Sequence, residues 1–242
     1  QYLQIMVRSK KYDFIFFPSL GMNDMAIKLG MIRTEALQIA GQGHPGEFPL
    51  MPIDAIMGPP GDFEVSSSYN VAIIKHRDVK VRKHGEFQLA QPAARKCSEK
   101  QLIGINAKAI KYSDIFLNFL ERLSKKLPGD ICLRFFPTES IGVHFYSARH
   151  LILKYFPTAE IEPYADYSSY LKKLSECAVC VSPFPFGNTN GHYDAIKCGV
   201  PSFCLSGSAV QSYGDRLVLE LAGLSKAIAT SEADLEAKII RF

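Results

Sequence analysis

Ser182-Pro183-Phe184-Pro185-Phe186-Gly187-Asn188-Thr189-Asn190-Gly191-His192-Tyr193-Asp194 reads as the end of a strand that leads directly into a helix. The apolar run that leads into it, 177–184, predicts a buried strand, and a glycine supplies the turn that follows. Asn188 or Thr189 can cap a helix there, and Gly-Val-Pro at 199–201 predicts the end of that helix. The start of a helix offers free backbone N–H groups and a partial positive charge, which bind anions and above all nucleotide phosphates. An ordinary capped helix is the alternative, and the local pattern alone does not choose between the two.

The composition is that of a soluble globular protein: 47% of the 242 residues are hydrophobic and 21% are charged, with a net charge of +4. The sequence has no run of about 18 apolar residues and no signal peptide, so we expect neither a membrane span nor export. Basic residues are scattered except at 75–83, where a solvated strand or linker is favoured over a patch for acidic ligands, and nucleic acid is not an expected partner. Because the chain begins at Gln1 and ends within a predicted helix, we interpret it as a fragment of a longer protein.

The six cysteines follow no regular framework, which favours free thiols and a reducing cytoplasm as the location of the protein. Cys177 and Cys180 have the spacing of a redox or zinc motif, but the sequence offers no second pair to complete a zinc site. Both residues fall in the apolar run 177–184, where a thiol behaves as a small hydrophobic group. Packing in the core is therefore the favoured interpretation.

Short apolar runs alternate with helical patterns along the chain, which predicts an α/β architecture with parallel sheets. In the first part of the chain we predict strands at 14–17, 36–40 and 53–57, and a helix at 22–29. In the second part we predict strands at 103–106, 131–136, 159–162, 178–184 and 201–205, and helices at 113–126, 144–155, 167–175, 188–198 and 209–222. A turn-rich and charged segment separates the parts, so we predict two domains, 1–90 and 91–242. The second is expected to be doubly wound, with its ligand at the carboxyl ends of the strands.

The motif at 183–191, Pro-Phe-Pro-Phe-Gly-Asn-Thr-Asn-Gly, is followed by Asp194, by Gly-Val-Pro at 199–201, by Ser206-Gly207 and by Leu-Ala-Gly-Leu at 221–224. These residues resemble the HMW1C-like bacterial N-glycosyltransferases, relatives of the O-GlcNAc transferases in glycosyltransferase family 41. Weaker matches extend the resemblance over most of the chain, at 18–22, 37–38, 43–45, 104–111 and 163–171. The resemblance implies a GT-B fold, in which two Rossmann-like domains face each other across a cleft, with the first domain only partly present.

The resemblance also implies an inverting transferase that moves a hexose from a UDP-sugar to a protein side chain, with asparagine N-glucosylation expected. No cofactor is expected beyond the UDP-sugar donor substrate, and no metal, because the sequence contains no Asp-x-Asp motif for a metal-bound diphosphate. The expected partners are a UDP-hexose and a polypeptide acceptor, such as an adhesin-like surface protein before its export. Two alternatives stay open: a related GT-B enzyme that acts on a glycan or a small molecule, and a non-catalytic nucleotide-sugar-binding remnant.

Lys111 and His44 are the candidate catalytic residues. Lys111 follows the strand at 103–106, where its ammonium would reach the departing diphosphate; a surface lysine is the default, and the resemblance favours the catalytic role. Lys108 competes for that role and stands where the family generally has a small hydroxyl residue. His44, in the loop Gly43-His44-Pro45, is predicted to act in the cleft, with an ordinary loop histidine as the alternative.

At the predicted helix start, the resemblance places the nucleotide on Asn190 and Asp194, beside the amides of Asn188, Thr189 and Gly191. A carboxylate accepts two hydroxyl hydrogen bonds, so Asp194 suits a ribose diol. The alternative for Asp194 is an acidic residue that only complements the helix dipole.

Two loops supply the remaining candidates for the donor site. Tyr164 and Tyr167 are predicted to form a wall for the uracil base, although the family typically has histidine where Tyr164 stands. The alternative is that both tyrosines cap the next helix and pack on it. Glu139, beside Ser140, is predicted to lie near the sugar, where relatives often carry polar amide residues. His192 is left out of the predicted site, because relatives have apolar residues at that position.

Overall fold

The computed structural model describes residues 12–18, 20, 24–41, 51–58, 72–75, 101–127, 129, 131–138, 140–207 and 210–242. The chain divides into two compact units, residues 1–83 with 208–211 and residues 84–207 with 212–242. The predicted domain boundary after residue 90 lies outside the described residues. Among the described helices, none is both long enough and apolar enough to cross a membrane.

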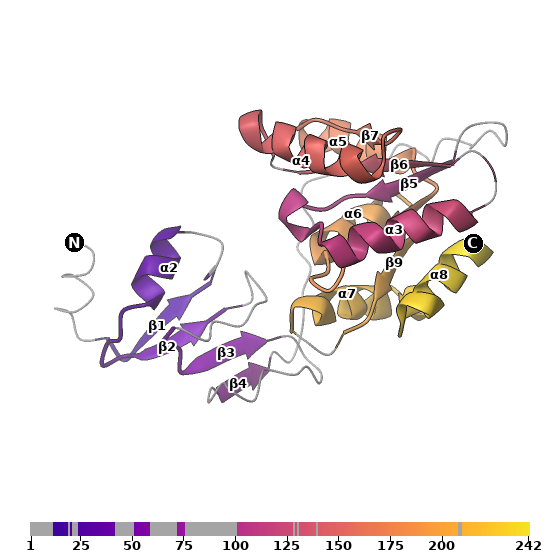
Figure 1. The fold of residues 1–242 in the computed structure, drawn as a ribbon. Helices are drawn as coiled ribbons and strands as arrows, with labels where there is room; N and C mark the ends of the chain where they lie inside the picture. Colours follow the sequence, from indigo (N-terminus) through magenta and orange to yellow (C-terminus); the bar gives the residue numbers. More distant parts are fainter. Residues whose placement is uncertain are drawn as a thin grey trace. The chain divides into compact units, whose positions relative to one another are not determined.

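The first unit contains a parallel four-stranded sheet in the order β1-β2-β3-β4 (Figure 1). Its elements are β1 (Phe14–Phe17), α2 (Asp24–Gly30), β2 (Leu37–Ala40), β3 (Ala55–Gly58) and β4 (Ala72–Lys75). Phe17, Leu20 and Ile56 are among the buried residues of its core. The predicted strands and helix are present, and β4 had no counterpart among the predictions.

The second unit is a parallel six-stranded sheet in the order β10-β9-β8-β5-β6-β7. Its strands are β5 (Gln101–Ile105), β6 (Ile131–Phe135), β7 (Glu160–Ile161), β8 (Val179–Val181), β9 (Ser202–Leu205) and β10 (Ile228–Ala229). Its helices are α3 (Asp114–Lys126), α4 (Gly142–Tyr155), α5 (Tyr167–Ser175), α6 (Thr189–Lys197), α7 (Val210–Leu221) and α8 (Glu232–Arg241), with 3-10 turns η1 (Ala109–Lys111) and η2 (Ser225–Ala227). The strand order is that of a doubly wound Rossmann domain, so the predicted doubly wound fold of the second domain is confirmed.

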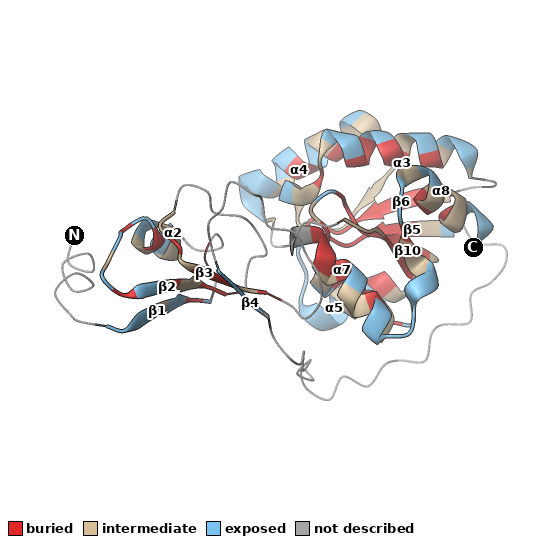
Figure 2. Cartoon of the chain, turned by 90° about the horizontal axis from the view of Figure 1, so that it is seen from below, coloured by how far each residue is buried: buried red, intermediate tan, exposed pale blue. Residues whose placement is uncertain are grey.

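Two hydrophobic clusters fill the second unit. The larger one includes buried residues of α3, α4 and α8 together with the central strands, and the smaller one includes residues of α5 and α6. The strands and the inward side of α3 are buried, whereas the outer sides of the helices are exposed (Figure 2). Cys177 and Cys180 are buried in the smaller cluster, where they pack as small hydrophobic groups.

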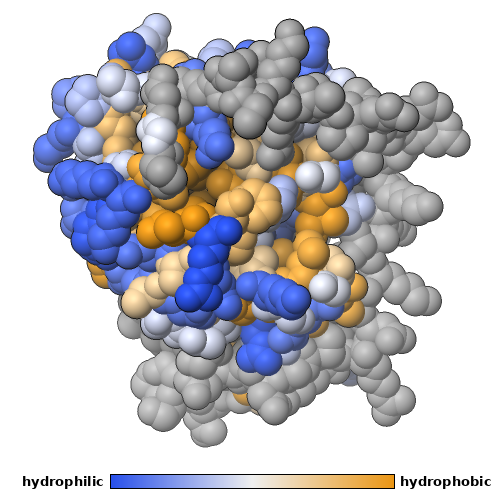
Figure 3. All heavy atoms as spheres, turned by 90° about the vertical axis from the view of Figure 1, so that its right-hand side faces the viewer, coloured by the Kyte–Doolittle hydropathy of each residue, from blue (hydrophilic) through white to orange (hydrophobic). Residues whose placement is uncertain are grey.

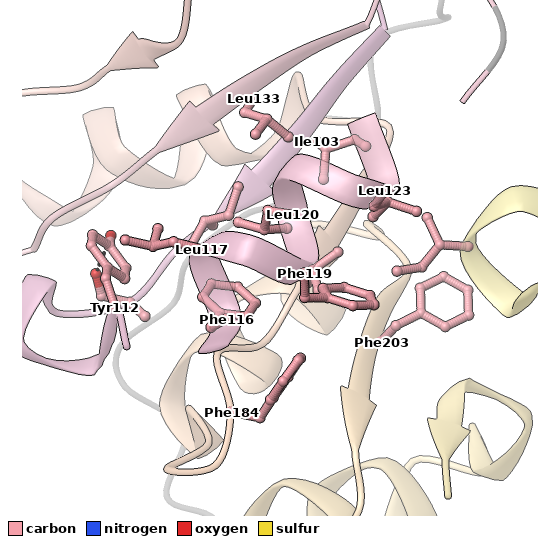
Figure 4. Packing of buried hydrophobic residues seen from close by; sticks show 14 of the residues in the cluster. Ile103, Tyr112, Phe116, Leu117, Phe119, Leu120, Leu123, Leu133, Phe184 and Phe203 are labelled. Atoms are coloured by element: carbon pink, nitrogen blue, oxygen red, sulfur yellow. Dashed lines mark hydrogen bonds between the residues drawn. The ribbon is translucent and has the colours of Figure 1, made fainter. Parts of the chain in front are cut away.

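Helix α3 shows how the sequence builds this core. The hydroxyl of Ser113 accepts the amide of Phe116, so Ser113 caps the helix as predicted. Apolar residues recur at helical spacing and face the sheet, among them Phe116, Leu120 and Leu123 (Figure 4). The opposite side of α3 is polar, and Lys126 and Arg122 form ion pairs with α8. Seen from the side on which α8 lies in Figure 1, the surface mixes hydrophilic and hydrophobic side chains (Figure 3).

The strand order positions the ligand site. Strand β5 has β6 on one side and β8 on the other, with Ile103 opposite Val179. The chain passes from β5 to β6 first and reaches β8 later, so the direction of winding reverses between β5 and β8. In a doubly wound sheet, ligands bind beyond the carboxyl ends of the strands at this reversal point. The segments after β5 and β8 are therefore the ones to inspect for a site.

Candidate functional site

The two segments at the reversal point are joined by side-chain hydrogen bonds. We refer to residues 182–188, which follow β8, as the site loop. The ammonium of Lys111 donates to the carbonyl of Gly187 at 2.8 Å, and the Ser113 hydroxyl donates to the carbonyl of Phe184 at 2.8 Å. The side-chain amide of Asn188 donates to the carbonyl of Asn106 at 2.6 Å. The segment after β5 thus holds the site loop from its middle to its end.

The site loop is also anchored in the core. Phe184 is 4% exposed, and its ring packs edge to face against Phe116 and Phe119 with centroids 5.4 and 5.3 Å apart. Figure 4 shows Phe184 beneath α3, pointing toward the two phenylalanines of that helix. Gly187 then turns the chain with a φ of 77°, a left-handed conformation that glycine adopts without strain.

Helix α6 begins immediately after this turn. Its first helical hydrogen bond runs from the His192 amide to the Asn188 carbonyl at 3.1 Å. The amides of Thr189, Asn190 and Gly191 precede that bond, and within the described part of the chain they donate to no protein acceptor. They form a set of N–H donors of the kind that binds phosphate at a helix start.

The predicted capping by Asn188 or Thr189 is wrong in its chemistry. Asn188 does occupy the N-cap position, but its side chain accepts no helix amide. Its side-chain oxygen accepts from Lys111 at 3.3 Å, and the Thr189 hydroxyl donates to Asp215 at 3.1 Å. Partners from distant segments therefore replace the local cap and leave the first amides of α6 available.

Lys111 lies beside this helix start. Its ammonium contacts Gly187 and Asn188 as described above and lies 5.3 Å from the centre of the Phe186 ring. Burial lowers the pKa of Lys111 below its ordinary value, the Asp215 carboxylate acts in the opposite direction, and Lys108 lowers the pKa further. An ammonium has three N–H donors, so Lys111 retains one for a ligand.

Asp194 lies one helical turn further along α6, where it meets two tyrosines of α5. The Tyr167 hydroxyl donates to one carboxylate oxygen at 2.6 Å, and the Tyr170 hydroxyl donates to the other at 3.1 Å. Burial and the bond to Asp194 raise the pKa of Tyr167 above its ordinary value. Each carboxylate oxygen has two lone pairs, so Asp194 can accept further hydroxyl groups beside the tyrosines.

The structure thus gathers most of the predicted residues around the start of α6. Tyr164 is 64% exposed on the loop before α5. Lys108 is half-buried at the start of η1, close enough to Lys111 to affect its pKa. His44 and Glu139 lie outside the described residues.

The sequence analysis missed Asp215 of α7, which contacts the site loop and the start of α6. Its carboxylate is 1% exposed and accepts hydrogen bonds from the Ser182 hydroxyl at 2.6 Å, the Thr189 hydroxyl at 3.1 Å and the Asn188 amide, which lies 2.8 Å from each oxygen. The residue lies in mid-helix and far along the chain, so no local pattern marks it. Asn106 was also missed, although its position directly after β5 was a usable signal.

Asp215 completes a buried array with His192 and Ser202. The Nε2 atom of His192 lies 3.1 Å from the Asp215 carboxylate, and its Nδ1 atom lies 2.8 Å from the Ser202 hydroxyl. His192 and Ser202 are 1% and 2% exposed, so no substrate reaches this serine and the array is not a hydrolytic triad. Elsewhere in the described ranges, no group of three or more His, Cys, Asp or Glu side chains is placed to hold a metal ion.

No family model matches the chain. The chain is 24% identical over 97% of its length to the UDP-glucose:protein N-beta-glucosyltransferase of Actinobacillus pleuropneumoniae serotype 5b (strain L20). It matches the enzyme of the same name from serotype 7 (strain AP76) at the same identity and coverage. The chain spans 38% of the length of each of these relatives.

Among solved structures, a mutant of the Thermobaculum terrenum O-GlcNAc transferase aligns with 99% of this chain and 47% of its own, with a TM-score of 0.74 and 13% sequence identity. At that identity the match establishes the fold. Taken together, the sequence relatives and this structure confirm the resemblance of the chain to the HMW1C-like protein N-glucosyltransferases and its GT-B type of fold.

Proposed function

We propose that the chain forms the donor-binding region of an inverting, metal-independent glycosyltransferase that moves a hexose from a UDP-sugar to an asparagine side chain of a protein. The observation that carries the proposal is the cluster at the β5–β8 reversal point. There, the ammonium of Lys111 contacts Gly187 and Asn188, and the amides of Thr189, Asn190 and Gly191 follow directly at the start of α6. Fixed donors of this kind stabilise a diphosphate without a metal.

In the proposed reaction, the acceptor nitrogen attacks the anomeric carbon of the sugar from the face opposite the diphosphate. The carbon–oxygen bond to the β-phosphate breaks as the carbon–nitrogen bond forms, and the electron pair leaves with UDP. Negative charge then grows on the β-phosphate, where Lys111 and the 189–191 amides are available to stabilise it. The proton lost by the acceptor amide goes to a base, and His44 is proposed to contact the donor or the acceptor.

The nucleoside end of the donor is assigned to α5 and α6. Asp194 would accept the ribose hydroxyls, and the half-exposed Tyr167 would pack against the base together with Tyr164. Glu139 is proposed to lie near the sugar and Lys108 near the phosphates. The names of the curated relatives support UDP-glucose as the hexose donor and a protein as the acceptor. A cytoplasmic reaction on an adhesin-like polypeptide before its export is part of the same proposal.

Calorimetry with UDP and UDP-glucose tests the donor site directly. We expect saturable binding of both ligands, and no heat and no thermal shift at millimolar UDP would contradict the proposal. For variants that remove the charge of Lys111, Lys125→Ala is the matched control, because Lys125 is exposed and pairs with Glu121 within α3. For the acceptor, the full-length enzyme is co-expressed with a candidate protein, and mass spectrometry should show a gain of one hexose on asparagine.

Asp194→Asn is expected to weaken UDP binding about tenfold while leaving inorganic pyrophosphate binding unchanged. A hydrogen bond to a charged group contributes about 1.5–3 kcal/mol, and an amide accepts the ribose hydroxyls less strongly than a carboxylate does. Competition calorimetry with the two ligands measures the difference. Equal losses for UDP and pyrophosphate would place Asp194 at the phosphates and contradict the assignment.

A further inference from the structure

Asp215 differs from the other residues of the site because it contacts the site loop from inside the protein. It accepts from the loop and the start of α6 through the contacts described above, yet it reaches them from α7. Removing a carboxylate from water is costly unless every oxygen is paired. A buried charge at this position therefore needs an explanation beyond packing.

We propose that Asp215 is the positioning residue of the diphosphate site: it fixes the turn that presents the amides of residues 189–191, and it is joined through Asn188 to Lys111. This inference rests on the proposed function, because it assigns Asp215 a role in binding the same diphosphate. Asp215 itself touches no ligand in this arrangement. It acts through Asn188, Thr189 and Lys111.

The backbone around Asp215 is shaped to admit the carboxylate. A Cβ atom at Gly187 would lie 3.0 Å from both carboxylate oxygens of Asp215, so the carboxylate fills the inside of the turn. A Cβ atom at Gly214 would lie 2.5 Å from the Thr189 hydroxyl, so α7 also approaches the start of α6 closely. Two glycines thus permit the contact between α7 and the site loop, and a larger acid at 215 would not fit in the same place.

Asn188 joins Asp215 to Lys111. Its backbone amide donates to the Asp215 carboxylate, and its side-chain oxygen accepts from the Lys111 ammonium. Burial opposes ionisation of Asp215, but the charge and hydrogen bond of His192, with the bonds from Ser182 and Asn188, outweigh it and hold the pKa of Asp215 below its ordinary value. The carboxylate is therefore ionised at neutral pH, and its charge opposes the loss of the Lys111 proton that burial favours.

Titratable groups from other elements act on this pair or feel its charge: Lys108 next to η1, His192 on α6 and Cys204 on β9. Tyr213 and Arg216 flank Asp215 along α7 itself. Lys108 lowers the pKa of Lys111, and His192 acts on Asp215. Removing the charge of Asp215 leaves Lys111 with the effects of burial and of Lys108 alone. The pKa of Lys111 then falls.

Asp215→Asn removes the negative charge at position 215, and asparagine can retain most of the hydrogen bonds of the carboxylate. Its side-chain oxygen would accept from Asn188 and Thr189, and its amide would donate to the hydroxyl of Ser182 and to Nε2 of His192. The variant therefore changes the charge at 215 with little change in shape.

The experiment measures UDP affinity by calorimetry as a function of pH for the wild-type chain, Asp215→Asn and Lys111→Met. The wild-type chain should lose affinity at alkaline pH as Lys111 loses its proton, and Lys111→Met should lack that alkaline loss. Asp215→Asn should bind UDP about tenfold more weakly at pH 7, a change of about 1.4 kcal/mol, and its alkaline loss should begin at lower pH. Asp234→Asn, which removes a carboxylate at the start of α8, should match the wild type.

An alkaline loss that begins at the same pH in Asp215→Asn and wild type would overturn the proposal. If the wild-type chain binds no UDP, the proposed function fails, and this outcome is distinct because it precedes any comparison of variants. Circular dichroism and thermal melting establish that each variant folds. If Asp215→Asn does not fold, Ser182→Ala with Thr189→Val takes its place, because it removes two donors to the carboxylate and keeps the charge. That double variant should bind UDP severalfold more weakly with an unmoved alkaline loss, and wild-type affinity would overturn the positioning role.

Discussion

Replacing Lys111 by methionine is expected to lower kcat for hexose transfer about 10²- to 10³-fold, the loss typical when one donor to a developing negative charge is removed. Methionine keeps the length and apolar stem of lysine but supplies no N–H donor. The Lys111 ammonium lies within hydrogen-bonding distance of Gly187 and Asn188, directly beside the free amides of α6. The measurement is steady-state transfer from UDP-glucose by the full-length enzyme.

Comparing the change in kcat with the change in KM for the donor distinguishes a catalytic role of Lys111 from a structural one. If Lys111 stabilises charge that develops on the leaving group, kcat falls more than KM for the donor rises. Lys125→Met, on the exposed side of α3, is the matched control and should behave as the wild type. Unchanged kcat in Lys111→Met would remove Lys111 from the mechanism.

Replacing Gly191 by alanine is expected to weaken UDP binding about tenfold or more. A Cβ atom at this position would lie 1.8 Å from the side-chain nitrogen of Asn188 and 2.9 Å from that of Asn106. Both side chains would have to move. The Asn188 side chain holds the end of the site loop to the Asn106 carbonyl, and the Asn106 side chain holds the Gly191 carbonyl at the start of α6. Overpacking of this kind costs about 1–3 kcal/mol, and the displaced side chains no longer hold the amides in place.

Calorimetry with UDP measures the effect of Gly191→Ala, and Gly129→Ala controls for a loss of stability alone. Gly129 has a φ of 85°, so alanine there introduces backbone strain, but a Cβ atom would meet nothing within 4 Å. Gly129→Ala should lower the melting temperature and leave UDP affinity intact. Wild-type affinity in Gly191→Ala would mean that the Asn188 and Asn106 contacts do not position the donor site.

The sequence predicted the second unit well because its signals are local. Helix α5 has the predicted bounds, Ser113 caps α3, and α6 ends just before Gly199, as predicted; Gly199 has a φ of 65°. Strand β8 stops at Val181, three residues before the predicted end, and prolines at 183 and 185 explain the difference because they have no N–H to donate to a neighbouring strand.

The parts that the sequence did not predict depend on distant partners. Asn188 looks like a helix cap in isolation, but its side chain instead joins Lys111 and Asn106, which lie about 80 residues earlier in the chain. Asp215 occupies a helix interior, where an acidic residue normally faces solvent. Strand β10 has only two residues, so its pairing with β9 defines it. Such contacts become visible only when the fold brings the segments together.

The burial of Phe184 beneath α3 has a thermodynamic consequence for the donor site. The same short loop contributes a ring to the hydrophobic core and, three residues later, the turn that precedes the free amides. Ligand binding at the start of α6 and the packing of Phe184 in the core are therefore thermodynamically linked. A ligand that binds at one end of the loop raises the free energy of unfolding of the unit whose core holds the other end. The melting temperature of the second unit should therefore rise when UDP binds. The added free energy of unfolding should grow with the logarithm of the UDP concentration.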